Sequence, residues 1–132
     1  MSDDFFTLTS YLHKNVITYP MEDYLEMIYR QKEKRNTITT LSIDLNVKKS
    51  SCSKMISKLK NLDLIYVEEN NIHLTPKGKN IASYLYHRHE VLEAFLKELN
   101  KEDFKLEQVE KVEHFIDDIT LNNLEEKLKK EL

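Results

Sequence analysis

Apolar residues recur at three- and four-residue steps along much of the chain, a spacing that places them on one face of a helix. Met21, Leu25 and Ile28 predict a first long helix. Its start is expected near Pro20, because proline is favoured at the first helical position. The pattern over residues 3–15 is mixed, and we expect at most one short helix there.

The following segment predicts a helix-turn-helix. A short helix is expected over residues 41–45, and Asn46 after it tolerates the backbone of a tight turn. A longer helix follows, with apolar residues again at helical steps. The expected capping residues are Thr39 or Thr40 for the first helix and Ser50 or Ser51 for the second. Short helix, tight turn and longer helix are typical of this DNA-binding motif.

Two short apolar runs, residues 65–67 and 72–74, then predict a β hairpin. Asn70 and Asn71 lie between them, and asparagine tolerates the positive φ of tight hairpin turns. A hairpin directly after a helix-turn-helix predicts the wing of a winged helix.

The C-terminal half is expected to be helical. Thr75 and Pro76 supply a cap and a first helical residue for a long helix that runs towards Leu99. Its expected buried stripe is Ile81, Leu85, Leu92 and Leu96. A final helical region is expected to bury Leu106, Val109, Val112, Ile116 and Ile119, followed by a charged amphipathic tail over residues 121–132.

Charge is distributed unevenly in this 132-residue chain of net charge -3. Residues 30–64 hold nine Lys/Arg against three acids, or +6, whereas residues 101–132 hold six Lys against ten acids, or -4. A basic segment in an acidic protein indicates an anionic partner for one face. No apolar run has the length of a membrane span and no signal peptide is apparent, so we expect a cytoplasmic protein. The lone Cys52 excludes an internal disulfide and a multi-thiolate zinc site.

The start of the second helix of the motif carries the groups that a recognition helix needs. Lysine charges bind phosphates, and serine hydroxyls bind phosphates or base edges. The candidate DNA-binding residues are Lys48, Lys49, Ser50, Ser51, Ser53 and Lys54. A solvated basic face is the alternative. Because phosphates would repel Glu68 and Glu69 at the wing tip, we expect the helix to dominate recognition.

Metal-type side chains occur in three separated places, at helical spacing within each group. They are Asp23 and Glu26, then His89, then Glu110, Glu113 and His114. Glu113 falls on an apolar stripe, where a carboxylate must be protonated, ion-paired or bound to a cation. His89 also falls on an apolar stripe, where a satisfied core histidine is the alternative. For Asp23 and Glu26 the alternative is a solvated face.

Several motifs together resemble the diphtheria-toxin-repressor/manganese-transport-regulator family, in that family's order and spacing, from about residue 20 onward. They are the runs at 21–29, 50–55, 74–79, 88–93 and 109–114, which read MEDYLEMIY, SSCSKM, LTPKGK, RHEVLE and VEKVEH. Lys49 departs from the family, where a proline is common at this position.

The resemblance implies a homodimeric, metal-activated transcriptional repressor that binds double-stranded operator DNA, without RNA or membrane partners and without enzymatic activity. The implied fold is mainly α. A winged helix-turn-helix domain with an N-terminal extension occupies residues 1–75, and an α-helical dimerisation and metal-binding domain occupies residues 76–132.

All six metal-type residues match ligand positions of the family. Oxygen donors at Asp23 and Glu110, where the iron-responsive branch has sulfur, imply the manganese branch and agree with the preference of Mn(II) for hard donors. Two Mn(II) ions per subunit are implied, with Fe(II), Zn(II) or Co(II) as substitutes, and control of manganese uptake is the implied role. The alternative is a metal-independent winged-helix repressor that senses a small organic ligand.

Overall fold

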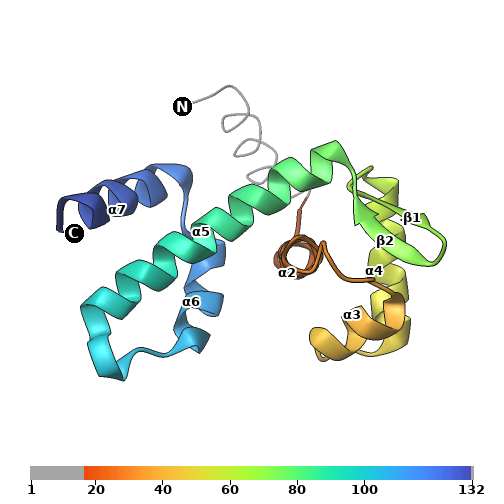
Figure 1. The fold of residues 1–132 in the computed structure, drawn as a ribbon, viewed down its shortest axis with the longest axis horizontal. Helices are drawn as coiled ribbons and strands as arrows, with labels where there is room; N and C mark the ends of the chain where they lie inside the picture. The colour runs from red at the N-terminus through yellow and green to blue at the C-terminus, as the bar shows by residue number, and fades with distance from the viewer. Residues whose placement is uncertain (1–16, 132) are drawn as a thin grey trace. The chain divides into compact units, whose positions relative to one another are not determined.

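The protein is described by a computed structural model that covers residues 17–131 (Figure 1). Contacts divide these residues into two units, the first ending at Tyr84 and the second beginning at Leu85. The short helix considered within residues 3–15 lies outside the described residues. Within the described part, no helix is both long enough and apolar enough to cross a membrane.

The first helix, α2 (Tyr19–Arg30), confirms the pattern that begins near Pro20. Thr18 is its N-cap, and the Thr18 hydroxyl accepts a hydrogen bond from the backbone N–H of Met21 at 3.3 Å. The side chains of Leu25 and Ile28 are buried. A proline in the first turn and a threonine cap therefore determine where this helix begins.

The helix-turn-helix is present, but the first of its helices begins earlier than expected. Helix α3 (Ile38–Asp44) is capped by Thr37, not by Thr39 or Thr40. Thr37 has an extended backbone and forms a reciprocal capping box with Thr40, which satisfies two backbone N–H groups at once. Asn46 has a φ of 55°, as the turn prediction required.

The second helix of the motif, α4 (Lys49–Asn61), also begins earlier than expected. Lys48 is the N-cap residue and no side chain caps the helix, so Ser50 and Ser51 lie inside its first turn. The buried side of α4 carries Cys52, Ile56 and Leu59. The serine hydroxyls are therefore on the surface and do not serve as caps.

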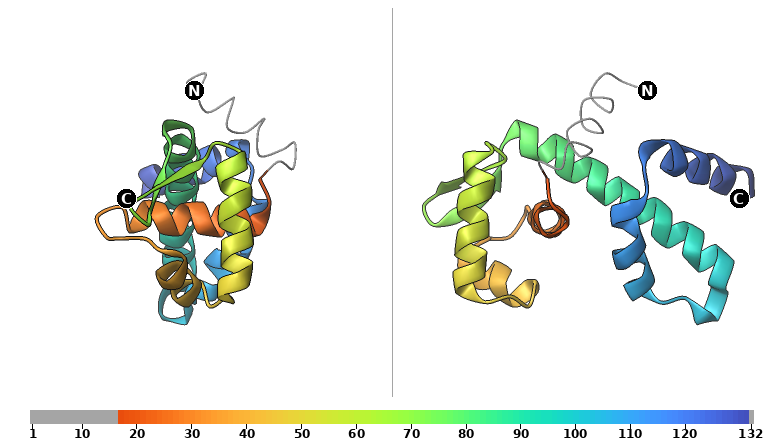
Figure 2. Two further views of the ribbon diagram at one scale, coloured as in Figure 1. Left: turned by 90° about the vertical axis from the view of Figure 1, so that its right-hand side faces the viewer. Right: turned by 180° about the vertical axis from the view of Figure 1, so that it is seen from behind.

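The wing is the antiparallel hairpin of β1 (Ile65–Glu68) and β2 (Asn71–Leu74), which lies beside α4 (Figure 2). The turn residues are Glu69 and Asn70, with φ of 49° and 61°, so the expected pair Asn70 and Asn71 was wrong by one position. Asn71 belongs to β2, where its side chain accepts a hydrogen bond from the backbone N–H of Asn36 at 2.8 Å.

Helix α5 (Pro76–Asn100) begins as predicted and is the longest helix of the described chain. The Thr75 hydroxyl accepts from the N–H of Gly78 at 3.0 Å and donates to the carbonyl of Asp63 at 2.7 Å. A Cβ atom at Gly78 would lie 1.9 Å from the carbonyl oxygen of Leu64. The single glycine thus permits backbone contact between α5 and the segment before the wing.

The chain of the second unit continues through η1 (Lys101–Asp103), α6 (Leu106–Val112), η2 (Glu113–Phe115) and α7 (Asp118–Glu131). The predicted buried stripe fails at both ends, because Leu106 and Ile119 are 45% and 67% exposed. Val109 is buried as expected, and Leu121, which was not part of the predicted stripe, is buried as well. The tight helix η2 and the extended Ile116 after it interrupt the 3.6-residue period, so a single face could not continue from α6 into α7.

Candidate metal and DNA sites

The centre of the candidate metal site in the second unit is a buried pair, His89 on α5 and Glu113 on η2. His89 is 5% exposed and Glu113 is 2% exposed, and His89 Nδ1 lies 2.7 Å from Glu113 Oε2. Two acceptor atoms approach this closely only when a proton lies between them. The pair satisfies two polar groups that would each be costly to bury alone.

Charged and partly exposed residues of the second unit surround the buried pair. Glu93, one turn along α5, places Oε2 3.8 Å from His89 Nε2, and its other oxygen lies 3.4 Å from the ammonium of Lys97. His114, the residue after Glu113, is half-buried, whereas Glu110 is exposed on α6. The buried part of the predicted cluster is therefore His89 with Glu113, and Glu110 is a surface residue of the same unit.

The two remaining candidate ligands belong to α2 in the first unit. Asp23 is exposed, and Glu26 is 9% exposed with Oε1 3.0 Å from the guanidinium of Arg30. The four-residue spacing of Glu26 and Arg30 is typical of a helical ion pair, so the sequence contained the signal for this contact.

Sequence reasoning missed the contact of Tyr24 with Cys52 of α4, the second helix of the motif. Tyr24 lies between the candidate ligands Asp23 and Glu26 in the sequence. Burial, with smaller contributions from the Cys52 thiol, raises the pKa of Tyr24 to about 12. Burial also raises the pKa of the Cys52 thiol, although its hydrogen bond with Tyr24 acts in the opposite direction. The thiol lies 3.5 Å from the carbonyl oxygen of Ile38. Cys52 thus joins three helices of the first unit and is wholly buried.

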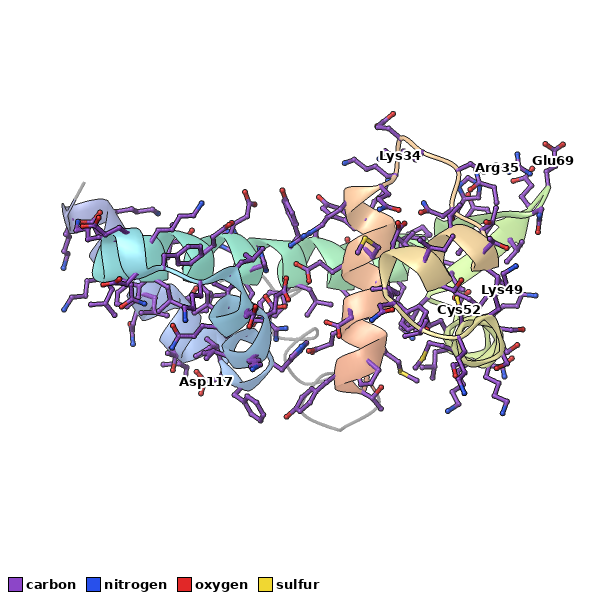
Figure 3. The ribbon with its side chains drawn as sticks, turned by 90° about the horizontal axis from the view of Figure 1, so that it is seen from below. Lys34, Arg35, Lys49, Cys52, Glu69 and Asp117 are labelled. Carbon is purple, nitrogen blue, oxygen red and sulfur yellow. The ribbon has the colours of Figure 1, made fainter. Side chains whose placement is uncertain are left out.

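The candidate DNA-binding residues all lie at the start of α4 and all are exposed. They are Lys48, Lys49, Ser50, Ser51, Ser53 and Lys54. Figure 3 labels Lys49 and the buried Cys52, both on this helix. Helix α4 has no acidic residue in its first turn and no side-chain cap, so its first N–H groups and its lysines present positive charge at the same end.

The donor types of the six candidate ligands fit a divalent cation of the harder transition metals. Four are carboxylates and two are imidazoles, and the chain's one thiol lies elsewhere, in the core of the first unit. Carboxylate and imidazole suit Mn(II), whereas thiolate ligands favour softer ions. This chain combines a helix-turn-helix, whose second helix has a basic, exposed start, with a buried imidazole–carboxylate pair. These features are typical of a metal-dependent regulator of transcription.

Comparison with protein families agrees with that class. Residues 17–71 match the family model of the iron dependent repressor, N-terminal DNA binding domain, and residues 75–130 match that of the iron dependent repressor, metal binding and dimerisation domain. The chain belongs to this family and is a metal-dependent transcriptional repressor, not an enzyme.

Individual relatives agree with the family assignment. The HTH-type transcriptional regulator MntR of Bacillus pumilus (strain SAFR-032) is 40% identical over 103 residues, which are 75% of this chain and 72% of that protein. The regulator of the same name from Bacillus subtilis (strain 168) is 39% identical over 103 residues, with the same coverage of 75% and 72%.

Solved structures give the same fold. The manganese regulator SloR has a TM-score of 0.71 and 29% identity, covering 82% of this chain and 53% of that one. A manganese-dependent transcriptional repressor in complex with manganese has a TM-score of 0.72 and 26% identity, covering 82% and 52%. This chain therefore spans about half the length of those two solved chains.

Proposed function

We propose that this protein is a Mn(II)-activated repressor that binds operator DNA as a homodimer in the cytoplasm and controls manganese uptake. The observation that carries the proposal is the buried pair of His89 and Glu113, held 2.7 Å apart in the family's metal-binding and dimerisation domain. Support for manganese comes from the donor set, which contains oxygen and imidazole nitrogen but no sulfur, and from relatives named as manganese regulators.

The proposed ligands hold two ions per subunit, and Fe(II), Zn(II) or Co(II) can substitute for Mn(II). The full set is Asp23, Glu26, His89, Glu110, Glu113 and His114. Glu26, Glu110 and Glu113 would each offer two carboxylate oxygens to the ions, and His114 would offer an imidazole nitrogen. Glu26 must exchange its contact with Arg30. That exchange costs about 1 kcal/mol at most, because the arginine is exposed.

The proposed mechanism follows from where the ligands lie in the chain. Asp23 and Glu26 belong to the unit that carries the recognition helix, whereas the other four ligands belong to the second unit. A bound divalent cation would supply the positive charge that the carboxylates of both ligand sets can neutralise. Tyr24 of α2 contacts Cys52 of α4 directly, so an ordering of α2 would be passed to the proposed recognition helix through this contact.

In the proposed homodimer, the two recognition helices must be about 34 Å apart to enter successive major grooves on one side of the duplex. Metal binding that fixes one unit against the other reduces the conformational entropy lost when DNA binds. The protein's own groups make the contacts, with Lys48, Lys49 and Lys54 at phosphates and the serine hydroxyls at phosphates or base edges.

The test is DNA affinity as a function of metal. A duplex is first selected from a random-sequence pool with Mn(II)-loaded protein. Its affinity is then measured by fluorescence anisotropy in chelator and in Mn(II), Fe(II) or Zn(II). We expect binding at least about tenfold tighter in Mn(II) than in chelator, a coupling of about 1.4 kcal/mol. Equal affinity in chelator and in excess Mn(II) would exclude metal activation, and a monomer mass from light scattering would exclude the dimer.

A further inference from the structure

The wing of this protein has no cation of its own with which to contact DNA. Residues 65–74 contain Glu68 and Glu69 but no lysine or arginine, so the hairpin carries a charge of -2. Both glutamates are exposed at the turn. A hairpin of this charge would be repelled by the phosphate backbone that α4 approaches.

The loop between α2 and α3, residues 31–37, carries the opposite charge. It contains Lys32, Lys34 and Arg35 against Glu33, so its charge is +2, and these four side chains are exposed. Figure 3 shows Lys34 and Arg35 on this loop and Glu69 at the far end of the hairpin. The loop and the wing both belong to the first unit.

Three hydrogen bonds attach this loop to the wing. The Arg35 guanidinium donates to the carbonyl oxygen of Glu69 at the turn. The backbone N–H of Asn36 donates to Asn71 Oδ1 at 2.8 Å, and the N–H of Ile72 donates to the carbonyl of Asn36 at 2.7 Å. Asn36 and Ile72 are buried, so the backbone on both sides of the attachment is fixed. The arginine is thereby held at the wing turn by the same contacts that hold the loop.

We propose that Arg35 supplies the DNA contact of the wing, by binding the phosphate backbone beside the groove that α4 enters. This inference rests on the proposed DNA-binding function. A guanidinium has five N–H donors in a planar fork that matches a phosphate, so a donor directed to Glu69 leaves others for a second acceptor. Its charge offsets one of the two wing glutamates, and the loop as a whole, at +2, neutralises the hairpin, at -2. Arg35 then places a cation at the wing turn, whereas the hairpin alone would be repelled.

The experiment compares Arg35→Gln with the matched control Lys32→Gln. Both variants lose one positive charge from the same loop, but the Lys32 ammonium lies 4.9 Å from the ring centre of Tyr29, whereas the Arg35 guanidinium is hydrogen-bonded at the wing turn. DNA affinity is measured for Mn(II)-loaded protein over a range of salt concentrations, with the duplex selected for the unaltered protein. For Arg35→Gln we expect about tenfold weaker binding and a salt slope smaller by about one per subunit. For Lys32→Gln we expect little change in either.

Two further measurements separate a DNA contact from a purely structural role. Hydroxyl-radical footprinting should show that Arg35→Gln loses protection only at the flank of each half-site. Arg35→Lys, which keeps the charge, should keep the salt slope. If Arg35→Gln lowers the melting temperature but leaves the salt slope unchanged, Arg35 only braces the wing and the proposal fails. Equal effects of Arg35→Gln and Lys32→Gln would also overturn it. Failure of the proposed function can be distinguished from failure of the Arg35 proposal, because in the former case the unaltered protein itself would show no metal-dependent DNA binding.

Discussion

Replacement of Glu113 by glutamine tests the proposed metal site most directly, because it removes a charge and keeps the shape. Glu113 is 2% exposed, and its carboxylate faces His89 at 2.7 Å. An amide can still hydrogen-bond with one tautomer of the imidazole, so the bond changes from charge-assisted to neutral at a cost of about 1 kcal/mol. Removing a buried carboxylate charge acts in the opposite direction. In chelator, we therefore expect the free energy of unfolding to change by less than about 1 kcal/mol.

The effect on metal should be much larger. An amide is neutral and cannot bridge two cations as a carboxylate does, so we expect Mn(II) affinity to fall at least about 100-fold, or about 2.8 kcal/mol. Thermal melts in chelator measure the fold, and calorimetric titration with Mn(II) measures the site. Glu107→Gln is the control, because Glu107 is exposed in the first turn of α6 and is not a proposed ligand. Full Mn(II) response in Glu113→Gln would refute the assignment.

Three further predictions concern DNA contact, metal preference and packing. Lys49→Ala should weaken operator binding and reduce the salt slope by about one per subunit while Mn(II) affinity is kept, and an unchanged slope would argue against phosphate contact. Asp23→Met should keep the fold but lower the preference for Mn(II) over Fe(II) in metal-dependent anisotropy titrations, because a thioether replaces a hard anion. An unaltered ratio would mean that Asp23 is not a ligand. Gly78→Ala should lower stability by about 3 kcal/mol or more in urea unfolding, because the new Cβ would lie 1.9 Å from the carbonyl oxygen of Leu64. A variant as stable as the parent would show that this contact relaxes freely.

The sequence alone determined the identity and order of the helices and strands from α2 to α5 and the helical character of the segments that follow, because local periodicity and turn residues act over a few positions. The run from Met21 to Ile28 predicted α2, and Thr75 with Pro76 predicted the start of α5. Boundaries were less well determined. Thr37, and not Thr39 or Thr40, is the N-cap of α3, because Thr37 forms a capping box with Thr40. Any of the three threonines has the hydroxyl that an N-cap needs.

Two regions failed for a different reason. At the wing turn, the positive φ expected of Asn71 is found at Glu69. Asn71 lies in β2 instead, because its side chain accepts a hydrogen bond from the backbone N–H of the loop residue Asn36. In the second unit, the expected face from Leu106 to Ile119 is broken by η2, which shifts the helical phase between α6 and α7. Local sequence propensity could predict neither the wing-turn position nor the break between α6 and α7. Each depends on a contact or an interruption outside the few residues from which the helical period is read.

For the site, the sequence and its family resemblance gave the residue types of the ligands and the place of Glu113 on an apolar face. Only the tertiary structure brought Glu113 to His89, which is 24 positions away in the chain. The contact of Tyr24 with Cys52, and that of Arg35 with the wing turn, also join residues far apart in sequence. Such contacts depend on how buried surfaces pack, because packing decides which distant polar groups must satisfy one another once water is excluded.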